Sequence, residues 1–139
     1  MKILPEIPAN PRATSLLTRG AMLALCVYWV ALFYGTHTKI PPGMLPGNSD
    51  KVIHFFAYAG LGMLWAILRA TQGALTWSNL SWKWLMLAAY GVFDELTQLL
   101  VNRNADLKDL LFDVSGAATG LTIVAFAVWG FQSKIWKRF

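Results

Sequence analysis

The sequence predicts an all-α membrane protein, a four-transmembrane-helix bundle with both termini cytoplasmic. Of the 139 residues, 56% are hydrophobic and only 14% are charged, whereas a soluble domain has about a quarter charged residues. Four apolar segments each approach the length of about 20 residues that spans a bilayer. The alternative is a soluble bundle of buried helices, but no segment has a clear polar face for water. The length suits one domain, 1–139.

The first half of the chain is expected to hold two of the helices. Residues 1–15 contain three prolines and predict an irregular or interfacial arm. The first helix is expected at 16–35, followed by a loop at 36–51 rich in proline and glycine, which interrupt helices. A second helix is expected at 52–68. The single cysteine, Cys26, excludes a disulfide framework and is expected to be buried in the first helix.

The second half begins with a polar connection over 69–83, whose two tryptophans, Trp77 and Trp82, suit a membrane interface. The third helix is expected at 84–101 and the fourth at 110–131. A short loop separates these two helices. The C-terminal tail is basic and aromatic.

Lys and Arg are distributed unequally between the two sides of this bundle. With four helices, the side of the termini receives eight basic residues and the other side four: Lys39, Lys51, Arg103 and Lys108. Because cytoplasmic segments carry the excess of basic residues, the termini and the second loop are expected in the cytoplasm. The first and third loops then face outward.

Six of the seven acidic residues then gather at the outer end, together with one histidine. Side chains three or four residues apart share a helix face, so three helices each present a polar stripe. Ionisable residues in a membrane normally face the bundle interior or a wet cavity. We expect the stripes to converge on an outward-facing polar pocket: Asp50, His54 and Tyr58; Asp94, Glu95 and Gln98; Asp109 and Asp113.

Part of this pattern has a purely structural explanation. Asp50 and Asp109 are placed to cap helix N-termini, and Asp106 is expected to face water in the loop. Lys51, Arg103 and Lys108 suit interfacial residues with snorkelling stems. A structural hydrogen-bond network that locks the helices together also explains the deeper polar residues. The small residues Gly116, Ala117, Ala118 and Gly120 predict close helix packing.

Two segments resemble the VanZ-like family of small bacterial membrane proteins. "DKVIHFFAYAGLGMLW" is similar to the family's D-K-x-x-H-F-x-x-Y pattern, and "GVFDELTQLLVNRNADLKDLLFDVSGAATG" is similar to its D-E-x-x-Q block with a following Arg, Asp and Gly. The first helix carries no such motif. Asp113 stands where the family often has Asn, which adds a potential charge. The matching positions are Asp50, Lys51, His54, Tyr58, Asp94, Glu95, Gln98, Arg103, Asp109, Asp113, Gly116 and Gly120.

The resemblance implies a multi-pass protein of the bacterial cytoplasmic membrane and cell envelope. The founding member lowers sensitivity to glycopeptide antibiotics such as teicoplanin, so an accessory role is implied and no particular reaction. We expect a binding protein for membrane lipids or a lipid-linked or anionic envelope ligand, with Arg103 and Lys51 pairing an anionic group. The oligomeric state is open.

An enzyme is the alternative, with His54 as the candidate catalytic base, Glu95 as the candidate acid and a lipid-linked substrate. No Ser, Cys or Thr stands in an evident activating context, so water would attack directly. No cofactor, metal or nucleic-acid partner is expected. In a metal variant, His54 joins Glu95, Asp109 or Asp113, and such oxygen-rich ligands suit a hard divalent ion.

Overall fold

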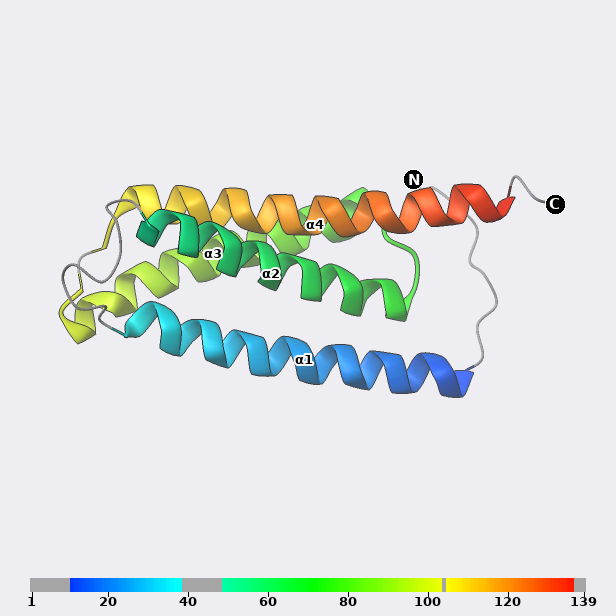
Figure 1. Cartoon of the computed structure of the whole chain (residues 1–139), viewed down its shortest axis with the longest axis horizontal. Coiled ribbons are helices and arrows are strands. Elements are labelled where there is room, and N and C mark those ends of the chain that lie inside the picture. Colours follow the sequence, from blue (N-terminus) through cyan, green and yellow to red (C-terminus); the bar gives the residue numbers. More distant parts are fainter. Residues whose placement is uncertain (1–10, 39–48, 104, 137–139) are drawn as a thin grey trace.

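The computed structural model describes residues 11–38, 49–103 and 105–136, and within these ranges the chain is helical, with no strand. The helices are α1 (Pro11–His37), α2 (Ser49–Gln72), α3 (Trp77–Gln98) with the 3-10 turn η1 (Leu99–Val101), and α4 (Leu107–Trp136). They run side by side, and α1 begins at the end of the bundle where α4 finishes (Figure 1). The predicted all-α, four-helix fold is confirmed. The termini's compartment stays a prediction.

The surface of the bundle is apolar along its length. All four helices are long and apolar enough to cross a membrane, over Ser15–His37, Ser49–Gln72, Trp77–Val101 and Leu107–Phe131. Large hydrophobic side chains point outward from every helix; Leu17, Phe56, Leu100 and Phe126 are each more than half exposed. Water-soluble proteins do not expose apolar surface on this scale. The described helices therefore form a multi-pass membrane protein rather than a soluble bundle.

Helix boundaries differ from the sequence prediction between α2 and α3. The polar connection predicted over 69–83 is largely helical, and α3 begins at Trp77 rather than at residue 84. Thr76 caps α3, because its side chain accepts a hydrogen bond of 3.2 Å from the Asn79 N–H. Gly73, with a φ of +148°, follows the end of α2 in a conformation that favours glycine. The polar composition of this segment was therefore misread as a loop, because polar residues are also tolerated in helices at the membrane interface.

Other helix ends also extend beyond the predicted limits. α1 begins at Pro11, inside the predicted arm, because proline fits the first turn of a helix. α2 begins at Ser49, and α4 continues to Trp136, into the predicted tail. Helix ends are poorly marked by hydropathy, since polar residues are tolerated where a helix leaves the membrane core.

Glycines set the close contact between α2 and α4. A Cβ added at Gly116 would clash with the backbone of Phe55, and one at Gly120 with the backbone of Ala59. Backbones come this close only where side chains are absent, as in membrane helix pairs. The predicted role of these small residues in packing is confirmed.

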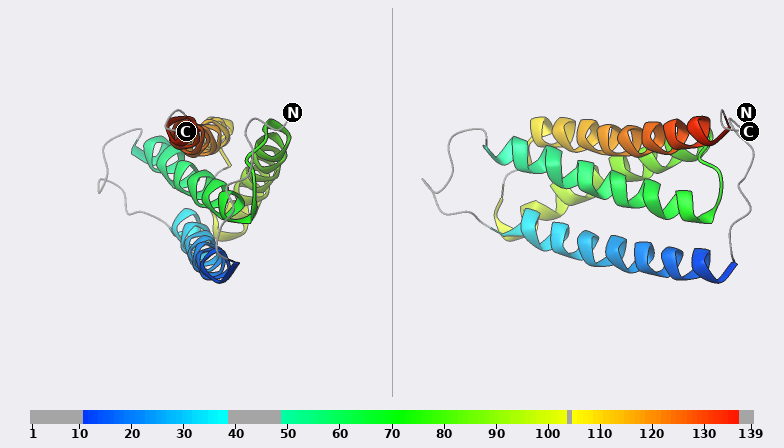
Figure 2. Two further views of the ribbon diagram at one scale, coloured as in Figure 1. Left: turned by 90° about the vertical axis from the view of Figure 1, so that its right-hand side faces the viewer. Right: turned by 45° about the vertical axis from the view of Figure 1, so that its right-hand side comes forward.

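The α1 helix lies at the edge of the bundle, on the far side of α2 from α4 (Figure 2). Its Tyr28 hydroxyl donates a hydrogen bond of 3.0 Å to the Ala57 carbonyl of α2. Much of α1 is exposed, and so is Cys26. The expectation of a buried Cys26 was wrong, because an edge helix turns most of its surface outward, where lipid rather than protein covers apolar side chains.

Candidate functional site

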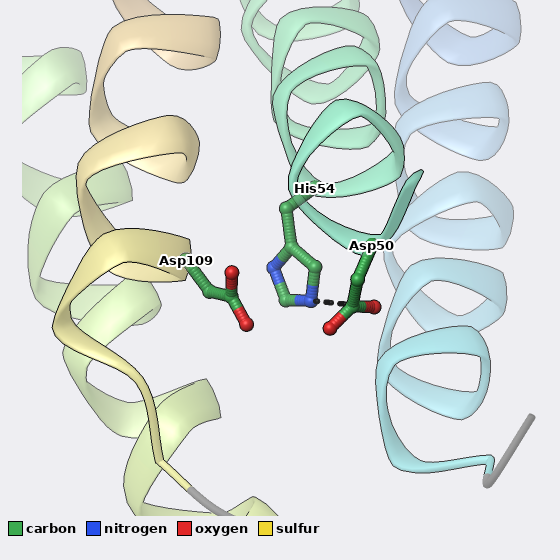
Figure 3. Close-up of side chains that lie close together, drawn as sticks. All are labelled: Asp50, His54 and Asp109. Carbon is green, nitrogen blue, oxygen red and sulfur yellow. Dashed lines mark ion pairs between the residues drawn. The ribbon is translucent and has the colours of Figure 1, made fainter. Parts of the chain in front are cut away.

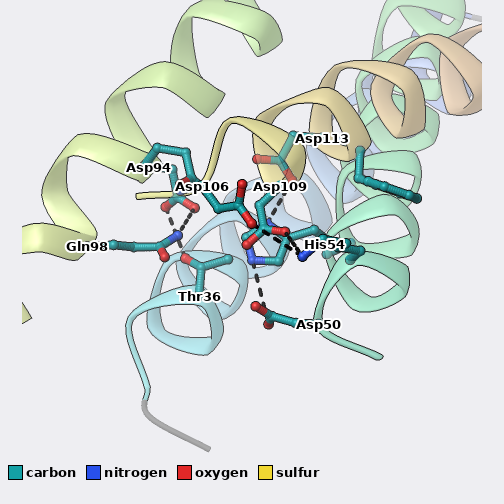
Figure 4. A network of polar contacts seen from close by, with 12 residues as sticks. Thr36, Asp50, His54, Asp94, Gln98, Asp106, Asp109 and Asp113 are labelled. Carbon is teal, nitrogen blue, oxygen red and sulfur yellow. Dashed lines mark hydrogen bonds and ion pairs between the residues drawn. The ribbon is translucent and has the colours of Figure 1, made fainter. Parts of the chain in front are cut away.

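A network of polar side chains occupies one end of the bundle, opposite the start of α1 (Figure 4). The end of α1, the beginning of α2, the end of α3 and the beginning of α4 all contribute to it. Its buried members are each at most 6% exposed: Thr36, His54, Asp94, Glu95, Gln98, Asp109 and Asp113. The structure thus brings the three polar stripes of α2, α3 and α4 together.

The first part of the network joins α2 to α4. His54 Nδ1 lies 2.9 Å from Asp113 Oδ1, so the imidazole and the carboxylate share a hydrogen bond. The other ring nitrogen, Nε2, lies 4.0 Å from Asp50 Oδ1, one turn earlier on α2. Figure 3 shows the His54 ring between the carboxylates of Asp50 and Asp109. Both nitrogens of this buried histidine therefore face acids.

The second part joins α3 to α1. Asp94, fully buried, accepts hydrogen bonds from the Thr36 hydroxyl at 3.0 Å and from the Gln98 amide at 3.2 Å. His37 lies 3.7 Å from the same carboxylate and contacts the Thr97 hydroxyl at 3.0 Å. Asp94 is therefore held by neutral donors from two helices.

The third part organises the connection between α3 and α4. Glu95 Oε2 accepts a hydrogen bond of 2.8 Å from the Asp106 N–H. Asp106 in turn accepts one of 2.9 Å from the Lys108 N–H, which makes it the N-cap of α4. This bond lowers the pKa of the Asp106 carboxyl, and Lys51 lowers it further. The cap is thus Asp106 rather than Asp109, which is buried as the third residue of α4.

Two basic residues lie at the outer edge of the network. Lys51 is 3.3 Å from both Asp106 and Asp109. Arg103 lies 3.4 Å from Asp50 and also donates to the Thr36 carbonyl. Each contacts residues from a different part of the chain, so neither is simply a snorkelling interfacial residue.

Arg103 is positioned by the turn that precedes it. Asn102 adopts a left-handed conformation with a φ of 54°, which asparagine tolerates better than most residues. The Arg103 N–H then donates to the Gln98 carbonyl at 3.1 Å. The turn therefore ends α3 and directs the chain back across the network.

Tyr58 does not join the network. It is fully buried in the hydrophobic core, and its ring packs at 6.0 Å from the ring of Tyr90. Its hydroxyl has no hydrogen-bond partner among the described residues. Of the ten predicted ligand-binding residues, the other nine lie within the network.

Two pockets open beside the network. One, of about 410 Å³, lies between the ends of α1 and α3 and is lined by Phe33, Tyr34, His37, Thr38, Thr97, Leu100 and Val101. The other, of about 210 Å³, lies between α3 and α4 and is lined by Val92, Glu95, Leu96, Ala105, Asp106, Leu107 and Leu110. Both combine an apolar wall with a few polar groups, as ligand sites usually do.

Four residues of the site were not predicted as part of it: Thr36, His37, Thr97 and Asp106. The signal for Asp106 was available, because an aspartate directly before an apolar helix is a typical N-cap. Thr36 and His37 carry no comparable signal, since only the packing of α1 against α3 brings them to Asp94.

Fold and site together define a four-helix membrane protein with a buried carboxylate and histidine network at one end of its bundle. The chain belongs to the VanZ/LLP1 family, whose profile matches residues 21–129. The resemblance found in the sequence is thereby confirmed, and the match includes all of α2 and α3. Searches of curated proteins and of solved structures find no match to this chain.

Proposed function

We propose that this protein is an accessory or binding protein of the bacterial cell envelope that holds an anionic lipid or lipid-linked molecule at the polar end of its bundle. The observation that carries the proposal is the pocket between α1 and α3, which adjoins the network directly. Phe33, Leu100 and Val101 offer an apolar wall to a hydrocarbon chain, while His37 and Thr97 are polar. An amphiphilic molecule matches both.

Arg103 supplies the charge for an anionic head group. Its guanidinium contacts Asp50 and the Thr36 carbonyl, yet the group has five N–H donors in a planar fork. Donors thus remain for a phosphate or carboxylate, which arginine binds in bidentate fashion. Lys51 is also partly exposed and is the second candidate. A polar end that faces outward, as the positive-inside rule predicts, gives this site access to envelope molecules.

The test is native mass spectrometry of the purified protein released from nanodiscs of phosphatidylglycerol or of phosphatidylcholine. We expect retained phosphatidylglycerol adducts on the wild type and their loss in R103Q. K83Q is the matched control, because Lys83 is a basic residue of α3 at the other end of the bundle. Equal phosphatidylglycerol retention by wild type and R103Q would contradict the proposal.

The same variants separate binding from a purely structural role of the charges. A network that only locks helices together predicts that R103Q and E95Q lose helicity or aggregate. A binding site predicts folded variants that have lost the ligand. Circular dichroism and size-exclusion chromatography before mass spectrometry distinguish these outcomes.

An accessory role in glycopeptide tolerance is proposed from family membership. Expression of the wild type in a susceptible bacterium should raise the minimal inhibitory concentration of teicoplanin, and R103Q should not. No change with a correctly inserted wild type would remove this role and leave lipid binding to be judged separately.

The second candidate is a membrane enzyme acting on a lipid-linked substrate. The observation that favours it is the contact of His54 with Asp113, since a carboxylate orients an imidazole for proton transfer. Glu95, the proposed partner, lines the pocket between α3 and α4. Turnover of a lipid-linked envelope precursor by the wild type, abolished in both H54Q and E95Q, would establish catalysis.

A further inference from the structure

Three carboxylates in the interior of the network have no described Lys or Arg beside them, although His37 lies near Asp94 and His54 near Asp113. Asp94, Glu95 and Asp113 are at most 5% exposed. In the part of the chain that the structure describes, no Lys or Arg lies within ion-pair distance of any of them. A buried carboxylate is stable only when a proton, a cation or several hydrogen bonds compensate for the lost water. Asp94 has Thr36 and Gln98 as donors.

In Glu95 and in Asp113, one of the two carboxylate oxygens lacks that compensation. Glu95 uses Oε2 for the Asp106 N–H, but its Oε1 is buried with no hydrogen-bond partner among the described residues. Asp113 uses Oδ1 for His54, and its Oδ2 is likewise buried and unpartnered within the described chain. Unsatisfied buried acceptors are rare in native proteins and each one calls for a partner.

We propose that His54, Glu95 and Asp113 bind a divalent cation. Ligand atoms of these three side chains all lie within 4.8 Å of one another. Adjacent ligands of an octahedral ion with bonds of about 2.1 Å are about 3.0 Å apart. The 2.9 Å between His54 Nδ1 and Asp113 Oδ1 matches that separation. The cation replaces the proton that these two atoms share.

The ligand set indicates a hard cation of the manganese or magnesium type. Two carboxylates and one imidazole are oxygen-rich ligands without thiolate, which suit such ions. Three helices supply one ligand each, so the cation also joins α2, α3 and α4. Three side chains leave further coordination positions for water or for oxygen atoms of a bound molecule.

A second group, Asp50, His54 and Asp109, also has its ligand atoms within 4.8 Å (Figure 3). Its carboxylates already have basic partners, because Arg103 lies beside Asp50 and Lys51 beside Asp109. A cation there would compete with both basic residues. Asp109 Oδ1 also has no hydrogen-bond partner among the described residues, but it lies 3.3 Å from Lys51 Nζ. The unpartnered oxygens of Glu95 and Asp113 have no Lys or Arg within ion-pair distance in the described chain, so the inner group is the assigned site.

The experiment uses Mn²⁺ alone as the probe, on the purified full chain in nanodiscs after removal of metals with EDTA. Electron paramagnetic resonance of free Mn²⁺ measures affinity and stoichiometry, with one ion per chain expected. Residues that only support the ligands contribute about 10- to 100-fold to metal affinity. Loss of a direct ligand in E95Q or D113N should therefore lower the Mn²⁺ affinity by more than about 100-fold. E95Q keeps an oxygen that accepts from the Asp106 N–H.

D50N distinguishes the two groups, because Asp50 belongs to the outer group alone, although its carboxylate faces the shared His54. Mn²⁺ binding should be retained in this variant if the inner group is the site. A nitrogen coupling in the pulsed spectrum of the bound ion should be present in the wild type and absent in H54Q. This spectrum tests the wild type even if an inner variant does not fold. The site is overturned by absent Mn²⁺ binding, by a bound ion without nitrogen coupling, by binding that survives E95Q and D113N, or by a loss confined to D50N. Lipid binding is measured without metal, so either proposal can fail alone.

Discussion

Thr36 shows how single residues complete the network. Its hydroxyl donates to Asp94 and its carbonyl accepts from Arg103, so one residue of α1 meets both an acid and a base. Asp94 has its other donor in Gln98, one turn along its own helix. The burial of this carboxylate therefore depends on a neutral donor from a neighbouring helix.

Replacing Thr36 with valine should lower the free energy of unfolding by about 1–3 kcal/mol, the cost of leaving a buried acceptor without its donor. Equilibrium unfolding in mixed detergent micelles, followed by circular dichroism, measures the change. Thr122→Val is the control, because the Thr122 hydroxyl bonds only the Ala118 carbonyl of its own helix and is exposed. Equal effects of the two substitutions would contradict a special role for Thr36.

Asp106 lies outside the membrane-spanning segments. It stabilises the start of α4 through the hydrogen bond of its side chain to the Lys108 N–H and through its charge beside Lys51. Asp106→Ala removes both and should lower the melting temperature more than Asp106→Asn, since asparagine is also a good N-cap. Thermal unfolding monitored by circular dichroism compares the three proteins. An asparagine variant as unstable as the alanine variant would show that charge, rather than capping, is decisive.

The advantage of wild type over Asp106→Asn should depend on pH. Folding lowers the Asp106 pKa, mainly through the Lys108 N–H. The stabilisation is therefore complete above the carboxyl's unfolded pKa and is lost as the pH falls through its folded pKa. The melting temperatures of the two proteins should differ at neutral pH and converge at strongly acidic pH. A difference in melting temperature that grows on acidification would contradict the predicted pH dependence.

Among the helices, α2 and α4 form the central pair and α1 is attached at the side. The central pair is joined by backbone contacts at Gly116 and Gly120, whereas α1 is held by individual side chains such as Tyr28. Close backbone approach maximises dispersion contacts, which drive helix association where lipid removes the hydrophobic effect. The network's geometry therefore depends first on the α2 and α4 contact.

Gly120→Ala should destabilise the bundle, because its methyl group would meet the Ala59 carbonyl and the Met63 backbone. Overpacking of this kind costs about 1–3 kcal/mol. Gly130→Ala, on the same helix, is the control: a Cβ there meets no atom within 4 Å, and alanine is the better helix former. Measured by unfolding in detergent, the free energy of unfolding should be lower than that of the wild type for Gly120→Ala and higher for Gly130→Ala. Two stabilised variants would contradict the close contact.

Over the whole molecule, acidic side chains are concentrated at one end of the bundle. The network end carries six of the chain's seven acids. The described Lys and Arg side chains occur at both ends: Lys51, Arg103 and Lys108 lie at the network end, and Arg19, Arg69 and Lys83 lie at the other end, where no acid is described. The helix ends that form the network lie together because successive helices alternate in direction (Figure 1). The orientation with both termini in the cytoplasm stays a prediction from the count of Lys and Arg in the sequence, because acids contribute little to the positive-inside rule.

Reporter fusions test that orientation. A phosphatase that is active only after export should be active when inserted in the first loop, within 39–48, and inactive at the C-terminus. A green fluorescent protein should show the opposite pattern. An exported C-terminus would reverse the orientation and place the network in the cytoplasmic leaflet, where envelope ligands outside the membrane would not reach it.

The sequence by itself determined the class of protein, the number of spans and most of the polar end. Hydropathy is a local property of about 20 residues, so four apolar segments are visible without the fold. Helical spacing grouped His54 with Asp50, and Asp94 with Gln98, because both pairs lie on single helices. The exact start of α3 was missed, since the Thr76 cap stands in a segment whose polarity resembles a loop.

Only the tertiary structure decided which groups pair across helices. Distances between His54 and Asp113, or between Thr36 and Asp94, join residues 59 and 58 positions apart, and no local pattern encodes such contacts. Helical spacing placed Tyr58 on the same face of α2 as His54, but the fold buries Tyr58 in the hydrophobic core and not in the network. Burial is a property of the packed helices, so the unpartnered oxygens of Glu95 and Asp113 became apparent only with the helices in place.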